Sequence, residues 1–391
     1  MRIAIVTESF PPDVNGVAHS VVRTAEHLVA RGHQPLVVAP APPGARRRPV
    51  DRQPYPVVRI PSVPLPRYQG FRLGVPGARL AAALRAHDPD VVHLASPFVL
   101  GARAATLARR HGLPTVAVYQ TDVASYARAY RVGWGEAAAW RRLREIHNSA
   151  HRTLAPSTRA AADLIANGVQ RIWLWRRGVD ADRFHPDHRC AALHHVLAPD
   201  GEVLVGYVGR LAPEKRVDLL AATSELPGVR VVVAGDGPAR RQLARALPRV
   251  RFLGVQQGEA LARLYASLDV FVHTGPHETF GQTVQEAAAS GLPVVAPAAG
   301  GPVDLVEPGV TGLLVPPGDG TALADAVAAL AADPARRAAY GSAARAAIGR
   351  RSWSAVGDEL VGHYEAAQLA ARSDPQRLGL GLPATGRPIL P

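Results

Sequence analysis

Short apolar segments alternate with amphipathic segments along the first half of the chain. The apolar run at residues 2–6 has the length of a buried strand, and residues 20–30 repeat their apolar positions with a helical period. Further strands are predicted at 36–39, 57–60, 91–93, 115–118 and 153–155, and further helices at 79–86, 102–110, 135–147 and 158–166. This alternation predicts a parallel sheet with helices on both faces.

A second series of the same kind begins near residue 203. Its strands are predicted at 203–208, 229–234, 251–253, 270–274, 294–296 and 312–315, and its helices at 217–225, 240–247, 259–266, 280–290, 322–331 and 336–348. Residues 176–201 break the rhythm and are predicted to link the two series. A last amphipathic helix is predicted at 353–371, before a Pro/Gly-rich tail that we expect to be disordered from Ser373 onward. Two open α/β domains of this kind bind ligands outside the carboxyl ends of their strands.

The composition is that of an ordinary globular protein, with 47% hydrophobic and 20% charged residues among 391. The length suggests two domains. The single cysteine, Cys190, excludes an intrachain disulfide and a cysteine-rich metal module, and it fits a reducing compartment. The N-terminal apolar run is too short for a signal peptide, and no uncharged run of 18 apolar residues occurs, so we expect no membrane-spanning helix.

The net charge of +13 is distributed unevenly. Residues 1–170 carry 22 basic and 10 acidic side chains, whereas residues 171–391 carry 23 and 22. We therefore expect the first half to meet an anionic partner. Lys215 is the single lysine among 45 basic residues, and a lysine that persists where arginine is the default suggests a role that arginine fills poorly.

The segment His277–Glu286 follows a predicted strand and opens a predicted helix. Exposed amides at a helix N-terminus favour anions, and Gly281 lets the backbone approach a ligand closely. Glu278 would lie beside that anion site, and Glu286 two turns into the helix on the same side. Two carboxylates spaced in this way suit a nucleotide sugar, which carries hydroxyls at both ends of a diphosphate. The plainer alternative is one acidic residue that favours the helix dipole and one on the solvated surface.

The loop Gly209–Arg216 follows the first strand of the second series and carries Arg210 and Lys215. A diphosphate leaving group needs its growing charge neutralised, for which arginine offers a bidentate fork and lysine a point charge. A surface ion pair of Lys215 with Glu214 or Asp218 is the alternative.

A third loop, Phe10–Ala18, joins the first strand to the first helix and contains Gly16. A glycine in such a turn lets backbone amides face a ligand. The loop lacks the G-x-G-x-x-G pattern, which weighs against dinucleotide binding. A plain strand-to-helix turn is the alternative.

Two further patterns in the predicted link are weaker evidence for a functional site. Asp180 and Asp182 form a D-x-D pair in the predicted link, where a turn is the simpler role. A cluster of histidine and cysteine in the same link matches no standard zinc spacing: His185, His188, Cys190, His194 and His195. We expect no metal site and no cofactor, and no G-x-S-x-G, H-E-x-x-H or P-loop pattern occurs.

These motifs together resemble the retaining GT-B glycosyltransferases of family 4. The resemblance rests on the E-x7-E pair Glu278 and Glu286, the Gly209–Lys215 loop, Gly16 and the Ala299–Pro302 turn, in family order over residues 1–370. Several further strings resemble actinobacterial GDP-mannose-dependent α-mannosyltransferases of membrane glycolipids: 92–98, 118–122, 153–157, 177–180 and 269–275. The implied fold is two Rossmann-like domains, 1–180 on the acceptor side and 181–352 for the nucleotide sugar, facing across a cleft. A helix at 353–372 would cross back to the first domain, before the tail 373–391.

The resemblance also implies residue roles. Arg210 and Lys215 would bind the donor diphosphate, Glu278 the hydroxyls of the donor sugar, and Glu286 the ribose hydroxyls. Gly16 would face the diphosphate from the other domain. Amides of one segment would hold the sugar and phosphate: Phe280, Gly281, Gln282 and Thr283.

One position departs from the family pattern. Many relatives carry a histidine where this chain has Gln120, after the predicted strand 115–118. A glutamine cannot shuttle a proton, so a positioning role remains for it. Asp122 and Asn15 are the acceptor-side candidates.

The implied activity is transfer of mannose from GDP-mannose with retention, without a metal, to a hydroxyl of a glycosyl or glucuronosyl diacylglycerol or a phosphatidylinositol mannoside. Arginines of the first half would hold the enzyme at an anionic membrane, on the inner face of the plasma membrane: Arg46, Arg47, Arg48, Arg52, Arg67 and Arg72 in loops and Arg141, Arg142 and Arg144 on a helix. A GT-B transferase that takes a UDP-sugar and a soluble acceptor is the main alternative. A basic nucleic-acid-binding protein is a further one, although no aromatic-interleaved basic motif supports specific binding.

Overall fold

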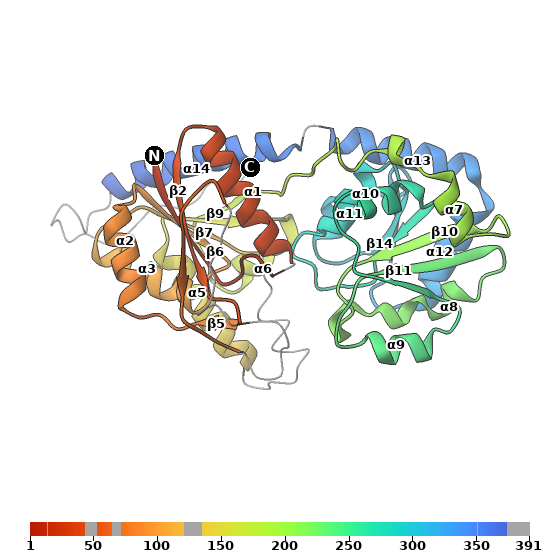
Figure 1. The fold of residues 1–391 in the computed structure, drawn as a ribbon, viewed down its shortest axis with the longest axis horizontal. Helices are drawn as coiled ribbons and strands as arrows, with labels where there is room; N and C mark the ends of the chain where they lie inside the picture. Colours follow the sequence, from red (N-terminus) through yellow and green to blue (C-terminus); the bar gives the residue numbers. More distant parts are fainter. Residues whose placement is uncertain (14, 44–52, 65–71, 121–134, 350, 374–391) are drawn as a thin grey trace. The chain divides into compact units, whose positions relative to one another are not determined.

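The computed structural model describes residues 1–13, 15–43, 53–64, 72–120, 135–349 and 351–373. The chain forms two compact units, residues 1–176 with 353–391 and residues 177–352. Each unit has its own parallel sheet covered by helices (Figure 1). The predicted disordered tail lies outside the described residues, apart from Ser373.

The sheet of unit 1 has seven parallel strands in the order β3-β2-β1-β6-β7-β8-β9. Their bounds are β1 Arg2–Thr7, β2 Gln34–Pro40, β3 Val57–Ile60, β6 Val91–Ala95, β7 Thr115–Val118, β8 Arg152–Ala155 and β9 Ile172–Leu174. The helices are α1 Gly16–Ala30, α2 Ala78–His87, α3 Leu100–Arg110, α5 Gly135–Ser149 and α6 Thr158–Ala166. A separate antiparallel pair joins β4 (Ser62–Pro64) to β5 (Arg72–Gly74).

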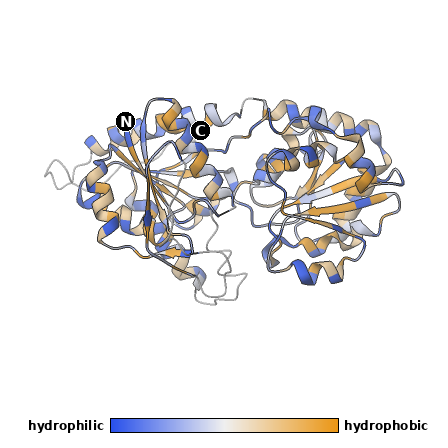
Figure 2. Ribbon diagram, viewed as in Figure 1, coloured by the Kyte–Doolittle hydropathy of each residue, from blue (hydrophilic) through white to orange (hydrophobic). Residues whose placement is uncertain are grey.

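Alternate residues of the central strand β1 face opposite sides of the sheet. Ile3 and Ile5 pack against α1 and against the last helix, α14 (Trp353–Arg372). Ala4 and Val6 pack against α2 and α3. Because both faces are covered, the strand is apolar at nearly every position, which is the pattern expected of parallel sheets and is visible in Figure 2.

Helix α14 belongs to unit 1, although it follows unit 2 in the sequence. The hydroxyl of Tyr364 lies 2.6 Å from Nδ1 of His93 in β6, and Nε1 of Trp175 donates to the carbonyl of Val356 at 3.0 Å. Gly357 packs so close to His27 of α1 that a Cβ there would overlap the imidazole ring. These contacts confirm that the last helix crosses back to the first domain.

The sheet of unit 2 has six parallel strands in the order β12-β11-β10-β13-β14-β15. They are β10 Val203–Val208, β11 Val229–Ala234, β12 Arg251–Gly254, β13 Val270–Val272, β14 Val294–Pro297 and β15 Gly312–Val315. The helices are α7 Ala191–Leu197, α8 Leu220–Ser224, α9 Arg240–Ala246, α10 Gly258–Ser267, α11 Gln282–Ala289, α12 Gly320–Ala332 and α13 Pro334–Ile348. Apolar clusters line both faces of this sheet too.

The structure corrects several predicted elements. The predicted helix 280–290 begins only at Gln282, because Gly281 has φ +97° and ends the preceding loop in a left-handed conformation. The predicted helix 217–225 is split into a 3-10 turn, Val217–Leu219, and the short α8. The predicted link contains a 3-10 turn, Pro186–His188, and helix α7. The sequence pattern also missed β9 and the β4–β5 pair, in which Arg72 is a strand residue that donates to Ser62 rather than a loop residue.

Candidate functional site

The carboxyl end of the unit 2 sheet is where a ligand site is expected. The strand order reverses between β10 and β13, and ligands bind α/β sheets at such switch points. The loop after β10 carries Arg210 and Lys215, and the loop after β13 carries Glu278 and leads into α11. Since the two strands are hydrogen-bonded neighbours, their loops emerge side by side.

Lys215 and Glu278 are in direct contact. Lys215 ends the 3-10 turn Pro213–Lys215, and its Nζ donates to Oε1 of Glu278. The two side chains are 15% and 21% exposed. Burial alone would raise the pKa of Glu278, but the charge of Lys215 holds it below its usual value, so the carboxylate stays ionised. Thr274 fixes the loop by donating its hydroxyl to the carbonyl of Lys215 at 2.6 Å.

The neighbouring acidic groups are engaged elsewhere. Asp218 pairs with Arg216 at 3.0 Å, and Glu214 lies 3.9 Å from Arg210. The surface pair of Lys215 with Glu214 or Asp218, which the sequence left open, is therefore not what the structure shows. The buried Glu214 instead lies beside Arg210 on the same loop.

The backbone of Glu278 is held by the Ala299–Pro302 turn. The amide of Gly301 donates to the carbonyl of Glu278 at 2.7 Å. Gly300 has φ +62°, and a Cβ there would lie 2.5 Å from the same carbonyl oxygen. Only glycine fits this close approach, which gives the turn singled out in the sequence a structural reason.

His273 lies against the same ion pair, and the sequence did not single it out for a role. Its side chain is 2% exposed, and its Nε2 lies 3.6 Å from Oε1 of Glu278. Its ring is stacked on Tyr207 of β10, with centroids 6.5 Å apart.

Arg177 is a second buried basic group that the sequence analysis missed. Burial lowers its pKa to about 10, while the charge of Glu278 raises it, so it stays positive at neutral pH.

Helix α11 begins directly after these loops. Phe280 is buried in the unit and Gly281 caps the helix, so the first amides are those of Gln282 and Thr283. The side-chain amide of Gln282 donates to the carbonyl of Gly178 at 3.3 Å. Positively polarised amides, Lys215 and Arg210 thus belong to the same sheet edge, which is a favourable setting for an anion.

Glu286 is nearer to the start of α11 than the sequence predicts. It is the fifth residue of the helix, in the second turn, because the helix starts at Gln282 rather than at Phe280. Burial raises its pKa to about 7. The hydroxyl of Tyr265 donates to its Oε2 at 3.2 Å.

The unit 1 candidates lie at the carboxyl edge of their own sheet. Asn15 is the N-cap of α1 and accepts from the amides of Val17 and Ala18, while Gly16 is the first helical residue and is exposed. Gln120 follows β7 and is 6% exposed. Asp122 lies outside the described residues.

At the switch point of unit 1, the N-terminus of α3 is occupied by the protein itself. Oε1 of Glu8 accepts from the amides of Val99 and Leu100, both at 2.6 Å, and from two adjacent amides. Burial is the largest influence on Glu8 and raises its pKa. This helix end therefore holds a carboxylate of the same chain, unlike the N-terminus of α11.

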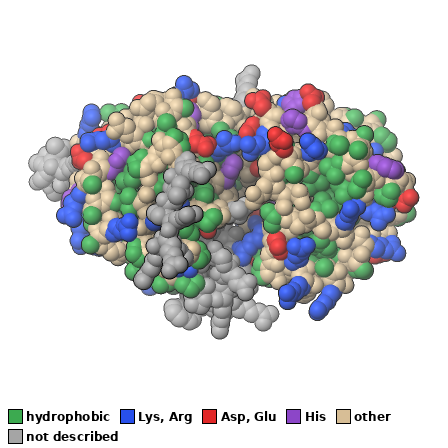
Figure 3. Space-filling view, viewed as in Figure 1, with side chains coloured by type: hydrophobic (Ala, Val, Ile, Leu, Met, Phe, Trp, Pro, Cys, Tyr) green, Lys and Arg blue, Asp and Glu red, His purple; other side chains and the backbone are tan. Residues whose placement is uncertain are grey.

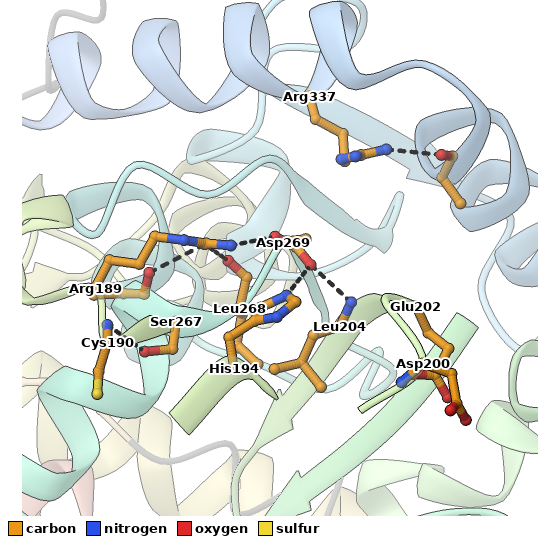
Figure 4. A network of polar contacts seen from close by, with 12 residues as sticks. Arg189, Cys190, His194, Asp200, Glu202, Leu204, Ser267, Leu268, Asp269 and Arg337 are labelled. Carbon is orange, nitrogen blue, oxygen red and sulfur yellow. Dashed lines mark hydrogen bonds and ion pairs between the residues drawn. The ribbon is translucent and has the colours of Figure 1, made fainter. Parts of the chain in front are cut away.

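The histidine and cysteine cluster has a structural role (Figure 4). Asp269 accepts from Arg189 at 2.8 Å, contacts Nε2 of His194 at 2.8 Å and accepts from the amide of Leu204 at 2.8 Å. The amide of Cys190 donates to Ser267 at 3.0 Å. These bonds tie α7 to the sheet. Across the described residues, no group of three or more His, Cys, Asp or Glu is arranged to hold a metal.

The D-x-D pair closes a turn, as the simpler reading of the sequence had it. The carboxylate of Asp180 accepts from the amide of Arg183 at 3.1 Å.

Within the part of the chain that the structure covers, no helix is long and apolar enough to cross a membrane.

Comparisons with known proteins show the family of the chain. Residues 14–183 match the model of Glycosyltransferase Family 4, and residues 193–347 match that of Glycosyl transferases group 1. A GDP-mannose-dependent alpha-mannosyltransferase of Mycobacterium tuberculosis is 51% identical over 94% of this chain and 97% of its own. A protein of the same name from Mycolicibacterium smegmatis is 50% identical over the same shares of the two chains.

The solved structures support the fold. Sucrose-phosphate synthase from Thermosynechococcus elongatus superposes with a TM-score of 0.80 at 24% identity, over 95% of this chain and 99% of that one. At this low sequence identity, the similarity is evidence for the fold alone. Together with the two family models, it confirms the predicted GT-B class of two Rossmann-like domains. The chain belongs to glycosyltransferase family 4 and is a glycosyltransferase.

Proposed function

We propose that this glycosyltransferase moves mannose from GDP-mannose to a hydroxyl of a membrane glycolipid or phospholipid. The donor is supported by the two relatives that are named as GDP-mannose-dependent and share half of the residues of this chain. The observation that carries the proposal is the contact of Lys215 with Glu278 at the switch point of unit 2. It unites a cation suited to a diphosphate with a carboxylate suited to sugar hydroxyls.

The proposal assigns the donor to unit 2. Arg210, Lys215 and the amides of Gln282 and Thr283 bind the diphosphate, with the backbone of Phe280 and Gly281 beside them. Glu278 accepts from hydroxyls of the mannose. The carboxylate of Glu286 accepts from the ribose hydroxyls. Positive groups that face the leaving diphosphate stabilise the charge that grows on it as the glycosidic bond breaks.

The transfer proceeds on one face of the sugar. The bond between the anomeric carbon and the phosphate oxygen breaks, and the acceptor oxygen bonds to the anomeric carbon on the same face. The acceptor hydroxyl gives its proton to the leaving phosphate oxygen, so the reaction needs no protein base and the configuration is retained. Lys215 and Arg210 supply the positive charge that a metal ion provides in other transferases.

The acceptor belongs to unit 1 in this proposal. Gln120 and Asn15 position its hydroxyl, together with Asp122, and Gly16 presents its amide to the diphosphate.

The basic first half supplies attraction to anionic lipid at the inner face of the plasma membrane. Arg141, Arg142 and Arg144 are exposed on α5, and each basic group near an anionic leaflet contributes about 1 kcal/mol. Lys and Arg side chains appear at many separate places on the visible face in Figure 3.

The donor test uses the purified chain with a membrane extract and either GDP-mannose, GDP-glucose, UDP-glucose or UDP-N-acetylglucosamine. We expect nucleotide release and hexose transfer to lipid with GDP-mannose. Transfer from a UDP-sugar alone, or transfer to the water-soluble fraction alone, would refute the proposal in its present form.

The membrane test is co-sedimentation with vesicles of phosphatidylglycerol and phosphatidylcholine. We expect binding to rise with the anionic fraction and to fall with salt, because the attraction is electrostatic. Binding that is indifferent to both would argue against an anionic membrane partner. A salt-dependent mobility shift of DNA by a chain without transferase activity would favour nucleic-acid binding instead.

A further inference from the structure

His273 is a buried histidine beside the proposed donor site. It directly follows β13, and its amide donates to the carbonyl of Val295 in β14 at 2.8 Å, so its backbone belongs to the rigid sheet edge. The ring is stacked on Tyr207, with an angle of 16° between the planes. Among the described residues, neither ring nitrogen makes a hydrogen bond within normal distance, and both are buried.

An orphaned buried imidazole is costly to a folded protein. A buried donor or acceptor that loses its partner costs about 1–3 kcal/mol, so each such group in a native structure calls for an explanation. Burial lowers the pKa of His273, and the charge of Lys215 adds to this effect. The carboxylate of Glu278 and the nearby backbone of Gly275 raise the pKa, but by less. The ring is therefore neutral, with one N–H to donate and one lone pair.

Glu278 is within easy reach of that N–H. Nε2 of His273 lies 3.6 Å from Oε1 of Glu278, the oxygen that also accepts from Lys215. A movement of about 0.6 Å by the carboxylate gives an ordinary hydrogen bond. Oε1 of Glu278 thus faces two donors. The charged Nζ of Lys215 is in contact with it, whereas the neutral Nε2 of His273 is slightly too far away for a hydrogen bond.

The contact of Lys215 with Glu278 brings the two groups together at the donor site, but the roles proposed for them require this contact to loosen when the donor binds. A lysine neutralised by a carboxylate lends little charge to a diphosphate, and a carboxylate held by an ammonium is a weaker acceptor for sugar hydroxyls. Both groups serve the donor fully only if the contact between them loosens. The carboxylate, which is mostly buried, then needs another donor.

We propose that His273 is a positioning residue, whose neutral imidazole donates from Nε2 to Glu278 when Lys215 turns from Glu278 to the donor diphosphate. The inference rests on the donor site proposed above. A neutral donor holds the carboxylate in place without cancelling its charge, so Glu278 accepts from the sugar and Lys215 keeps its full charge for the leaving group. His273 itself touches neither donor nor acceptor.

The test compares the His273→Phe and His273→Gln variants of the full-length chain with the wild-type enzyme. Phenylalanine keeps a ring against Tyr207 and fills the same space but has no N–H, whereas glutamine keeps a donor. Wild type is first assayed with a panel of GDP- and UDP-sugars, and the variants are then assayed with the donor that it uses. A donor other than GDP-mannose would overturn the proposed function while leaving the His273 test intact.

We expect His273→Phe to lower kcat about 10- to 100-fold, the effect of one hydrogen bond to a charged group. The Kd of the nucleoside diphosphate, which lacks the hexose that Glu278 holds, should rise by a much smaller factor than kcat falls. His273→Gln should recover part of kcat. The control is His147→Phe, since His147 is an equally buried histidine of α5 in unit 1. Unchanged kcat in His273→Phe would overturn the inference. So would an equal loss of nucleoside diphosphate binding, or an equal loss of kcat in the control.

Discussion

Lys215 donates to Glu278 from a loop that lies 63 positions earlier in the sequence. The contact exists because β10 and β13 are neighbours in the sheet, so that the loops that follow them converge. The only lysine of the chain is thereby placed against the first carboxylate of the E-x7-E pair. Arginine is the basic residue at the 44 other basic positions of the chain, and lysine occurs at this one.

Replacing this lysine tests the leaving-group role. We expect Lys215→Ala to lower turnover about 100-fold or more, the usual cost of removing one group that stabilises charge in a transition state. Lys215→Arg should recover only part, because the guanidinium is larger and cannot act as the same point charge. Steady-state kinetics with thermal unfolding separate activity from folding. The matched control is Arg249→Ala, an exposed cation paired with Glu225 at 2.9 Å, and near-normal turnover of Lys215→Ala would contradict the assignment.

Glu286 predicts a pH dependence of donor binding. Burial raises its pKa to about 7, so the group is mostly protonated at pH 6 and mostly ionised at pH 8. A carboxylate accepts from two ribose hydroxyls better than a carboxylic acid does, so the Kd for GDP-mannose should rise severalfold from pH 8 to pH 6. Calorimetry without acceptor measures this directly. Glu286→Gln should bind more weakly at pH 8 and lose most of the pH dependence, and an identical pH profile in both proteins would contradict the assignment.

Asp269 predicts a pH dependence of stability. Burial alone would raise its pKa, but hydrogen bonds from His194, the amide of Leu204 and Arg189 hold it below its usual value. A lowered pKa in the folded state stabilises the protein above the unfolded pKa of about 3.9, and this stabilisation is lost as pH falls through the folded value. We expect Asp269→Asn to lower the free energy of unfolding by about 2 kcal/mol at pH 7. The difference should shrink at pH 3.5, as measured by urea denaturation, and equal stabilities at pH 7 would refute the structural role.

Two glycines of α14 make a matched test of the crossover helix. A Cβ at Gly357 would lie 2.3 Å from Cδ2 of His27, whereas a Cβ at Gly362 would meet no atom within 4 Å. Gly357→Ala should therefore destabilise unit 1 by about 1–3 kcal/mol through overpacking. Gly362→Ala should stabilise it by about 0.5–1 kcal/mol through helix propensity. Thermal melts of both variants decide this, and similar shifts would show that α14 does not dock where the structure places it.

Much of the fold could be predicted because its strands are apolar on both faces. Runs such as 115–118, 203–208 and 229–234 are bounded by polar residues or turns, and the structure confirms their ends. The misses have physical causes. Strand β9 has only three residues, none of them fully buried, and α7 is a short helix with two adjacent histidines, so neither shows a clear apolar period.

The sequence singles out the residues of the candidate site, but it does not show their contacts. Arg210, Lys215, Glu278 and Glu286 stand out by type and spacing, yet nothing in the sequence pairs Lys215 with Glu278 rather than with Glu214 or Asp218. That choice depends on strand order. His273 was missed because it continues an apolar strand and shows no motif, and its burial under the ion pair is evident only in three dimensions.

The central claim is transfer of mannose from GDP-mannose to a lipid of the membrane. Mass spectrometry of the lipid fraction, after the purified chain is incubated with GDP-mannose and a membrane extract, tests it most directly. We expect a lipid that gains one hexose with wild type, and none with Lys215→Ala at the same protein concentration. A wild-type chain that binds GDP-mannose but leaves every lipid unchanged, or that adds hexose only from UDP-sugars, would contradict the account.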